Sequence, residues 1–371
     1  MALGTVSVNN LNLGQGPVTE IERYFLFIGP APKNIGKLIP LNTQSDLDVQ
    51  LGIPDSDLKQ QIAAARANGS SRWAAMAAPI APDGSWQDAL AYAQREGVSV
   101  EAVVITRPAA DATELQAMHT AAVELGNRYG RRVFVMAAAP GLTDAQDWST
   151  YLEAARMLVA DIAAPRVLCV PQLHRNNLGV LAGRLASAEV SIADSPMRVA
   201  SGAVVGLGET PRDKDGVPLD MAVLAELDKA RYSVPQTYPD YPGTFWGDGN
   251  LLDAPGSDFN VVENLRVADK AARRVRILLI QRVADRKVNN TPNSMASTRT
   301  ALMRPLREMA RATTFAGQTF PGEIQPPQDG DVVLTWKSRT EVEVFIKIRP
   351  FNSPKTLTAN IALDLSGGDE E

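Results

Sequence analysis

The chain contains two histidines and one cysteine, which are the residue types most often used for proton transfer, metal binding and nucleophilic attack. His174 follows a Val-Pro strand end and stands beside Arg175, where parallel sheets often carry catalytic groups. No Ser, Cys or carboxylate stands at a spacing that would make a catalytic pair with it. A polar histidine at a loop edge is therefore the favoured interpretation, and a catalytic base is the alternative.

The other reactive side chains give weaker signals. His119 lies in a helical pattern, and without a second His or Cys at ligand spacing we expect no transition-metal site. Cys169, in the apolar run RVLCV, predicts a buried strand residue rather than a nucleophile. Asp194-Ser195-Pro196 lacks a GxSxG context and predicts an ordinary turn. No phosphate-binding glycine motif is present, so we expect no nucleotide or other cofactor.

The elements that would position these residues alternate between strand and helix. Between about residues 100 and 205, strand-like runs such as EAVVIT and RRVFVMAA are separated by helical segments. An earlier unit contains the apolar run YFLFI and a helix with the sequence DLKQQIAAARANG. This order predicts a three-layer or doubly wound α/β domain. For the whole chain we expect a multidomain protein of the α/β and α+β classes.

Length and charge limit the class of protein. With 371 residues, of which 45% are hydrophobic, the chain can form two or three domains. A net charge of -5 argues against nucleic-acid binding by the whole chain, because phosphate binding needs a cationic surface. The sequence starts without the charged and apolar regions of a signal peptide, and no run approaches the roughly 20 apolar residues of a membrane span. The single cysteine favours a reducing compartment.

The most informative segment runs from Tyr241 to Arg311. It contains a Pro/Gly/Trp turn, a long basic helix (VVENLRVADKAARRVRILLIQRVADRK), the Asn-Pro break NNTPNSM and a second helix. At about 100° per residue, the apolar residues of the long helix form one stripe, and Arg266, Lys270 and Arg273 cluster opposite. We expect this helix to pack by one face and to present these cations by the other, either to solvent or to an acidic partner.

Both ends of the chain carry extended patterns. Residues 1–20 alternate weakly and predict an arm. The last 31 residues contain EVEVFIKIRP and TLTANIALDL, two period-2 segments that predict a β-hairpin with an exposed terminal strand, before an acidic tail. Exposed edge strands pair with other chains, so we interpret both ends as an assembly device. The apolar arm positions are Val6, Val8, Leu11, Leu357, Ile361 and Leu363.

Together these segments resemble the contractile tail sheath proteins of myophages and phage-tail-like particles. The resemblance rests on YFLFIGPAPKNIGKLIPLNTQSDLDVQLG, on VPQLHRNNLGVLAGRLA with IADSPMRV, and on GTFWGDGNLL with the basic helix, the Asn-Pro break and the hairpin. It covers nearly the whole chain as short patterns. The usual sheath turn is nearer to WGARTL, whereas this chain has WGDGNL at 246–251, so the cation after the glycine is missing. The chain is also short, which places it among the compact sheaths.

The resemblance implies an α/β domain inserted into an assembly domain. The expected parts are an N-terminal extended arm at 1–20, a small α/β unit at 21–95, an α/β outer domain at 96–215, an inner assembly domain at 216–350 and a C-terminal strand arm with an acidic tail at 351–371. Six copies would form a ring, and rings would stack helically around a tail tube. Each arm would add a strand to a neighbour's sheet, and the three cations of the long helix would face the tube.

The resemblance also implies partners and a location. Besides other copies of itself, a sheath subunit contacts the tail tube, baseplate and tail terminator proteins, without direct contact to nucleic acid or membrane, and it belongs to the virion tail, assembled in the host cytoplasm. It is not an enzyme and needs no cofactor. Contraction, which drives the tube through the host envelope, would be a rigid-body rearrangement of subunits hinged on the arms. The alternatives are an α/β hydrolase with a site near His174 and a non-contractile tail or baseplate scaffold.

Overall fold

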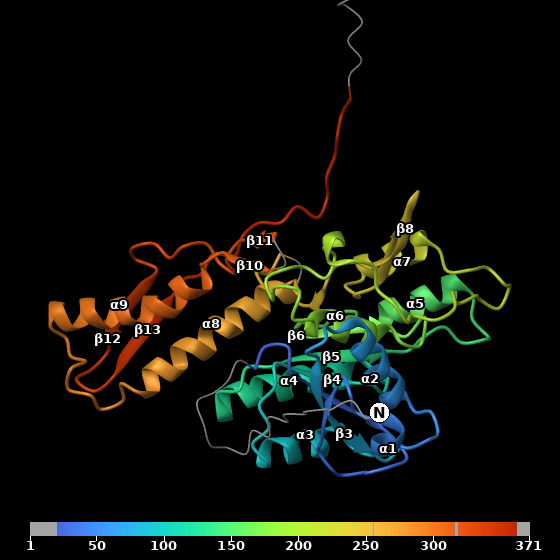
Figure 1. Ribbon diagram of the computed structural model, residues 1–371, viewed down its shortest axis with the longest axis horizontal. Coiled ribbons are helices and arrows are strands. Elements are labelled where there is room, and N and C mark those ends of the chain that lie inside the picture. Colours follow the sequence, from blue (N-terminus) through green and yellow to red (C-terminus); the bar gives the residue numbers. More distant parts are fainter. Residues whose placement is uncertain (1–20, 255, 316–317, 362–371) are drawn as a thin grey trace, which may run out of the picture.

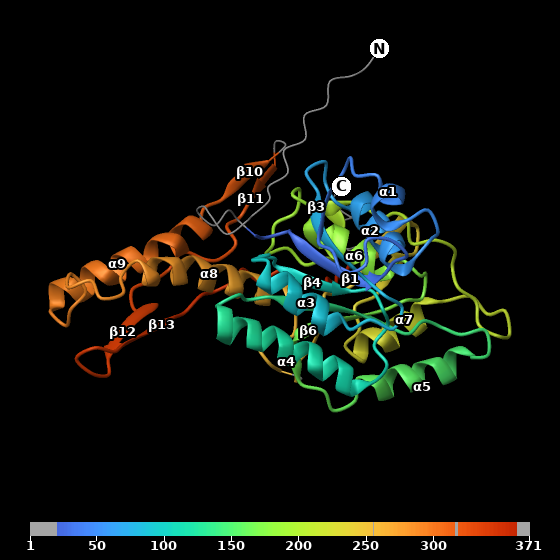
Figure 2. The ribbon, with the colours of Figure 1, turned by 90° about the horizontal axis from the view of Figure 1, so that it is seen from below.

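The computed structural model describes residues 21–254, 256–315 and 318–361. A large α/β domain forms most of the molecule, and a long helical hairpin projects from one side of it (Figure 1). A view turned by 90° shows the same projection, with the far end of the hairpin clear of the α/β domain (Figure 2). The chain after the last strand crosses back over the root of the hairpin and then extends away from the body (Figure 1).

The α/β domain is built on a seven-stranded sheet with the strand order β2-β3-β1-β4-β5-β6-β9. Its strands are β1 (Phe25–Pro30), β2 (Ile39–Asn42), β3 (Ala74–Ile80), β4 (Ala102–Ile105), β5 (Phe134–Ala139), β6 (Ala164–Pro171) and β9 (Leu251–Leu252). The five central strands are parallel, and the edge strands β2 and β9 are antiparallel to their neighbours. Continuous apolar runs suit the central strands, because both faces of a parallel sheet are covered.

Helices cover both faces of the sheet. They are α1 (Leu47–Leu51), α2 (Asp57–Asn68), α3 (Trp86–Arg95), α4 (Ala112–Tyr129), α5 (Trp148–Leu158), α6 (Asn177–Ala186) and α7 (Met221–Lys229), with a 3-10 turn at Val199–Ser201. Leu26 and Phe27 of β1 are neighbours in sequence but lie in different apolar clusters, since alternate strand residues point to opposite faces. The cluster of Leu26 includes residues of α3, α4, α5 and α7, and that of Phe27 includes residues of α1, α2 and α6. The expected doubly wound α/β class is therefore confirmed.

Helices α2 and α6 pack backbone to backbone. A Cβ atom added to Gly179 would lie 2.2 Å from the carbonyl oxygen of Gln61, and one added to Gly183 would lie 2.2 Å from that of Ala65. The two glycines are four positions apart on α6 and thus share one face. This close approach explains the glycines of the LGVLAG motif.

The projecting part begins with α8 (Val262–Ile280) and α9 (Pro292–Met309), joined through the predicted Asn-Pro break. Thr291 caps α9, and Pro292 follows at its first position, which needs no backbone donor. Strands β12 (Val332–Trp336) and β13 (Val342–Ile346) pair with each other and share an apolar cluster with both helices. Smaller two-stranded sheets are formed by β7 (Pro235–Tyr238) with β8 (Tyr241–Trp246) and by β10 (Thr313–Phe315) with β11 (Gln318–Phe320).

The structure differs from two expectations about organisation. The strands expected in separate units at 21–95 and 96–215 lie in one sheet, with β1 between β3 and β4, and β9 from the later region joins its edge. The C-terminal hairpin also pairs differently: β13 pairs with the preceding β12, and the described residues 356–361 lie in no strand. The sequence VVLTW, only five residues before β13, supplies a nearer partner than TLTANIALDL.

Candidate functional site: the polar junction of helix α8

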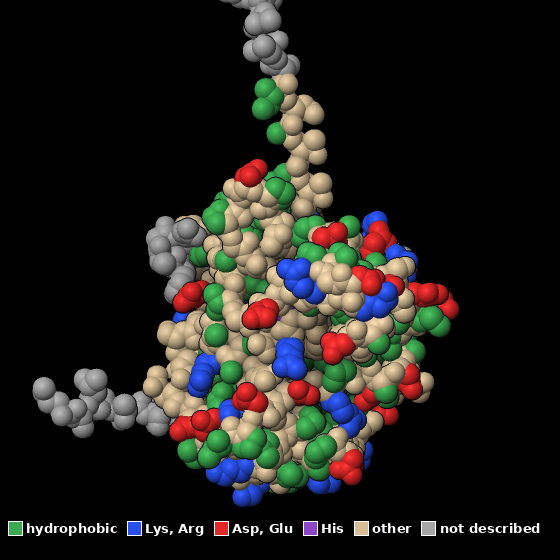
Figure 3. Space-filling view, turned by 90° about the vertical axis from the view of Figure 1, so that its right-hand side faces the viewer, with side chains coloured by type: hydrophobic (Ala, Val, Ile, Leu, Met, Phe, Trp, Pro, Cys, Tyr) green, Lys and Arg blue, Asp and Glu red, His purple; other side chains and the backbone are tan. Residues whose placement is uncertain are grey.

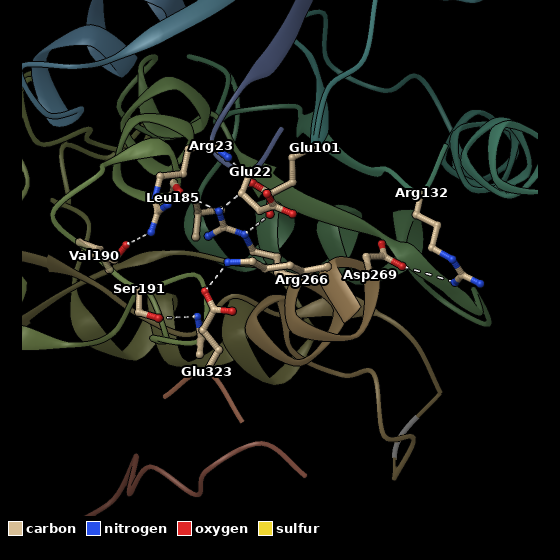
Figure 4. A network of polar contacts seen from close by, with 12 residues as sticks. Glu22, Arg23, Glu101, Arg132, Leu185, Val190, Ser191, Arg266, Asp269 and Glu323 are labelled. Atoms are coloured by element: carbon tan, nitrogen blue, oxygen red, sulfur yellow. Dashed lines mark hydrogen bonds and ion pairs between the residues drawn. The ribbon is translucent and has the colours of Figure 1, made fainter. Parts of the chain in front are cut away.

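A buried ion pair joins α8 to the central sheet. Arg266 contacts Glu101, which precedes β4, at two points: Nε lies 2.7 Å from Oε1, and Nη2 lies 2.9 Å from Oε2 (Figure 4). The residues are only 2% and 1% exposed. Nη2 of Arg266 also donates to the carbonyl of Leu185, and the backbone amide of Arg23 donates to Glu101. Burial raises the pKa of Glu101, but the charge and hydrogen bonds of Arg266 outweigh it, so this carboxyl's pKa lies below its usual range.

Further ion pairs flank this contact along α8. Asp269 accepts two hydrogen bonds from Arg166 of β6, at 2.8 and 2.9 Å. Lys270 Nζ lies 2.6 Å from Glu323 Oε1, and Arg273 Nη2 lies 2.7 Å from Glu22 Oε1. Figure 4 shows Glu22, Glu101 and Glu323, which come from separate parts of the chain, around α8. Charge-assisted pairs on several sides therefore fix both the rotation and the axial position of α8.

The expectation that the three cations lie on an exposed face of the helix is wrong. Arg266 is 2% exposed, Lys270 is 5% exposed, and Arg273 is half-buried in its contact with Glu22. A helical wheel separates apolar from charged residues, but it does not reveal that acidic side chains 53 to 251 positions away cover the charged face. In the described chain these cations attach α8 to the rest of the molecule.

A second charged cluster lies where the C-terminal segment crosses the start of α8. Lys355 Nζ lies 2.6 and 2.7 Å from the carboxylate oxygens of Asp248 and 2.9 Å from Glu263 Oε1. Burial and the charge of Asp248 raise the pKa of Glu263 against the effect of Lys355. Desolvation lowers the pKa of Lys355, but the two carboxylates raise it more, so it is held above its usual value. Asp248 belongs to the WGDGNL turn. It is one of the residues by which this turn differs from the usual sheath pattern, and it is the residue that binds Lys355.

The arm residues fall partly outside the described residues. Outside them lie Val6, Val8, Leu11 and Leu363, so the expectation that they pair with a neighbouring subunit stays a prediction. Leu357 and Ile361 are described and are 82% and 96% exposed. In Figure 3 hydrophobic side chains of the C-terminal segment stand clear of the body. These two residues therefore have almost their whole surface available for another chain.

The residues considered for catalysis have structural surroundings. The backbone amide of His174 donates to Asn177 Oδ1 at 2.7 Å, and burial lowers the pKa of the His174 ring. The cavity beside it, of about 680 Å³, has no Ser or Cys among its lining residues. Cys169 is buried in β6, where desolvation raises its pKa to about 12, so the thiol stays protonated. The interpretation of Cys169 as a buried strand residue is confirmed.

The remaining candidates are also engaged or buried. His119 lies in α4, and burial lowers its pKa, which favours the neutral ring. Ser195 Oγ donates to Asp248 at 3.3 Å and accepts from the amide of Met197, as expected for a turn. Among the described residues, no group of three or more His, Cys, Asp or Glu side chains has an arrangement that could hold a metal ion. Nor does any described helix combine the length and apolar character needed to cross a membrane.

Solved structures define the class of fold. The chain is similar to the PVC sheath complex of an extracellular contractile injection system in its contracted state, with a TM-score of 0.64 and 14% identity over 98% of both chains. It is also similar to a chain of the anti-feeding prophage baseplate (TM-score 0.60, 13% identity, 97% and 100% covered). The sheath tail protein from Desulfitobacterium hafniense gives a TM-score of 0.55 at 11% identity, over 93% and 96% of the two chains. The fold is that of sheath proteins.

Sequence comparison identifies the family. The pattern described as "DUF2586, N-terminal domain" matches residues 3–250, and "DUF2586, C-terminal domain" matches residues 258–366. The chain belongs to the DUF2586 family. It is 42% identical over 368 residues, 97% of this chain and 98% of the relative, to the "Putative tail sheath protein" of Haemophilus phage HP1 (strain HP1c1). The gap between the two matches, residues 251–257, contains β9 and ends shortly before α8, where the projecting part begins.

Proposed function

We propose that this chain is a contractile tail sheath subunit, a structural protein of the virion tail that polymerises around a tail tube. The observation that carries this proposal is the 42% identity, over nearly the full length of both chains, to the tail sheath relative of phage HP1. The sheath fold supports it independently. A hydrolase at His174 is not supported, because the cavity beside it has no Ser or Cys in its wall and the relatives are structural proteins.

Assembly proceeds through strand addition between copies, in hexameric rings that stack helically. Strands β12 and β13 form a sheet of only two strands, so each keeps one edge without a partner among the described strands. Such a hairpin is marginally stable alone and gains from a further strand. Its outer face carries the exposed pair Val333 and Phe345, 42% and 53% exposed. The extended segment with Leu357 and Ile361, from a neighbouring copy, supplies both backbone pairing and apolar cover.

The hairpin of α8 and α9 is the part that contacts the tube. Arg266, Lys270 and Arg273 pair with carboxylates of the same chain and are not the tube-contacting residues. Other basic residues lie on the surface of the hairpin, namely Arg276, Arg286, Lys287, Arg304, Arg307 and Arg311. On the opposite end of the molecule, basic and acidic side chains are interspersed (Figure 3). The exposed acidic residues Asp285 and Glu308 are fewer than these basic residues, and a mainly basic hairpin suits a tube with an acidic outer surface. The baseplate and tail terminator proteins are the further partners at the two ends of the sheath.

Negative-stain electron microscopy of purified protein tests the proposal. The full chain is compared with a variant that ends at Lys355, which keeps the contacts of Lys355 and removes only residues 356–371. We expect long striated tubes from the full chain and dispersed subunits from the truncated one. Rings that never stack would favour a non-contractile tail or baseplate scaffold, and dispersed particles from both would overturn strand-linked self-assembly.

A further inference from the structure

The path of the chain after β13 has a defined last point of attachment. Arg349 is held by Asp331, and the carbonyls of Arg349 and Pro350 accept hydrogen bonds from Gln325. Lys355 then contacts Asp248 and Glu263. Among the described residues that follow, 356–361 are all exposed and have no hydrogen bond or ion pair to the body. Lys355 is thus the boundary between the attached chain and the free segment.

The receptor for Lys355 is prearranged by other groups. Asp248 Oδ1 accepts from the backbone amide of Gly249 at 2.9 Å and from Ser195 Oγ at 3.3 Å, which orient the carboxylate before the lysine arrives. Glu263 lies in the first turn of α8 and is 6% exposed. A lysine ammonium has three donors, and here it has three oxygens within 2.9 Å. The backbone of residues 351–355 makes no hydrogen bond to the described backbone of the body, so the side chain of Lys355 is what attaches this stretch.

The Lys355 contact is electrostatic and lies partly in solvent. Two further carboxylates lie nearby: Asp228, which interacts electrostatically with both Asp248 and Lys355, and Asp194, which lines the same cavity of about 420 Å³ as Glu263 and Lys355. The buried Oε2 atom of Glu263 has no hydrogen-bond partner. Lysine, unlike a buried apolar anchor, keeps its side chain partly in water, with 29% of it exposed. Its departure therefore exposes little apolar surface.

We propose that Lys355, Asp248 and Glu263 form a latch that holds the root of the C-terminal segment on the α/β domain and opens under load. When the latch is closed, the free segment starts at residue 356. When it opens, residues 351–355 join the free segment and extend its reach by about 17 Å, at about 3.4 Å per residue. A subunit that moves relative to the neighbour holding its segment would use this reserve of chain. This last step rests on the proposed sheath function, whereas the latch itself does not.

Trypsin tests the latch on the full chain at a concentration below assembly. Trypsin cuts after Lys355, whereas the bond after Arg349 leads into Pro350 and is resistant, so removal of residues 356–371 reports the latch. We expect cleavage of the native chain to be slower than that of a synthetic peptide of residues 350–361. Asp248→Asn should increase the rate about tenfold and Glu263→Gln by less, because Asp248 provides two of the three contacts.

Glu343→Gln is the matched control, because it removes a carboxylate from the exposed Lys337–Glu343 pair of the β12–β13 hairpin. It should leave cleavage at Lys355 unchanged. Circular dichroism checks that each variant is folded. If Asp248→Asn does not fold, the cleavage rate of Glu263→Gln tests the latch instead. Equal cleavage of the native chain and the peptide, or of native chain and folded variants, would overturn the latch. If tubes form but the native chain is cleaved as fast as the peptide, the latch is refuted and the sheath proposal stands. If the native chain resists cleavage but no tubes form, the latch stands and the sheath proposal is refuted.

Discussion

Glu101 Oε1 and Arg266 Nε lie 2.7 Å apart although the two residues are 165 positions apart in the chain. One residue directly precedes β4, the middle strand of the sheet, and the other lies in the first helix of the projecting hairpin. The pair is almost fully buried, so water cannot replace either partner. The α/β domain and α8 are therefore joined as one body, and relative motion in an assembly has to occur elsewhere.

Removing one charge of this pair should be costly. Glu101→Gln leaves the Arg266 guanidinium buried without its counter-charge, and we expect the free energy of unfolding to fall by about 3–5 kcal/mol. Urea denaturation followed by circular dichroism measures this. Glu343→Gln, in an exposed pair, should change the free energy by about 0–1 kcal/mol. A loss at Glu101 no larger than that of the control would contradict the structural role of the pair.

Stability should decrease in acid. Hydrogen bonds from Arg349 lower the pKa of Asp331, and Arg266 lowers that of Glu101 against the effect of burial. Carboxyls with lowered pKa values stabilise the fold above their ordinary values of 3.8 and 4.5, and this stabilisation is lost as the pH falls through their folded values. Urea unfolding at a series of pH values between 7 and 3 should show the decline below about pH 4.5. Glu101→Gln should reduce this dependence of the free energy of unfolding on pH. An unchanged dependence would exclude Glu101 as one of its causes.

The contact between α2 and α6 gives a backbone test. Gly183→Ala places a Cβ atom 2.2 Å from the carbonyl oxygen of Ala65, so the helices must separate, and we expect a loss of about 1–3 kcal/mol. Gly126→Ala on α4 meets nothing within 4 Å and should instead stabilise the chain by about 0.5–1 kcal/mol. The midpoint temperature of thermal unfolding should fall for Gly183→Ala and rise for Gly126→Ala, relative to the native chain. A stabilised Gly183→Ala variant would show that the helices do not approach so closely.

The basic hairpin gives a test of tube contact. Reversing two exposed charges, with Arg286→Glu and Lys287→Glu together, should weaken binding to purified tail tubes, and the loss should be largest at low salt. Co-sedimentation at two salt concentrations measures this. Lys33→Glu, an exposed lysine of the α/β domain, is the control and should bind like the native chain. If the hairpin variant co-sediments normally at low salt, the tube contacts another surface.

Much of the fold follows from local patterns in the sequence. Apolar runs predicted the buried strands around YFLFI and RVLCV, and the Asn-Pro break marked the start of α9. The pairing of elements did not follow from local patterns. The partners of Arg266, Lys270 and Arg273 are Glu101, Glu323 and Glu22, and nothing near the helix announces them. Likewise the period-2 pattern of β13 predicts a strand but not which strand lies beside it, because pairing depends on the whole topology.

The contact between Lys355 and Asp248 also restricts which segments can be exchanged between sheath proteins. A turn of the WGARTL kind has alanine where this chain has Asp248 and arginine where it has Gly249. Transplanted alone, it would remove the main acceptor of Lys355 and bring a second cation into the cluster. It would also add a side chain at position 249, where even a Cβ atom would lie only 2.5 Å from Val262 Cγ1. The turn and the C-terminal segment should therefore be inherited, or engineered, as a matched pair.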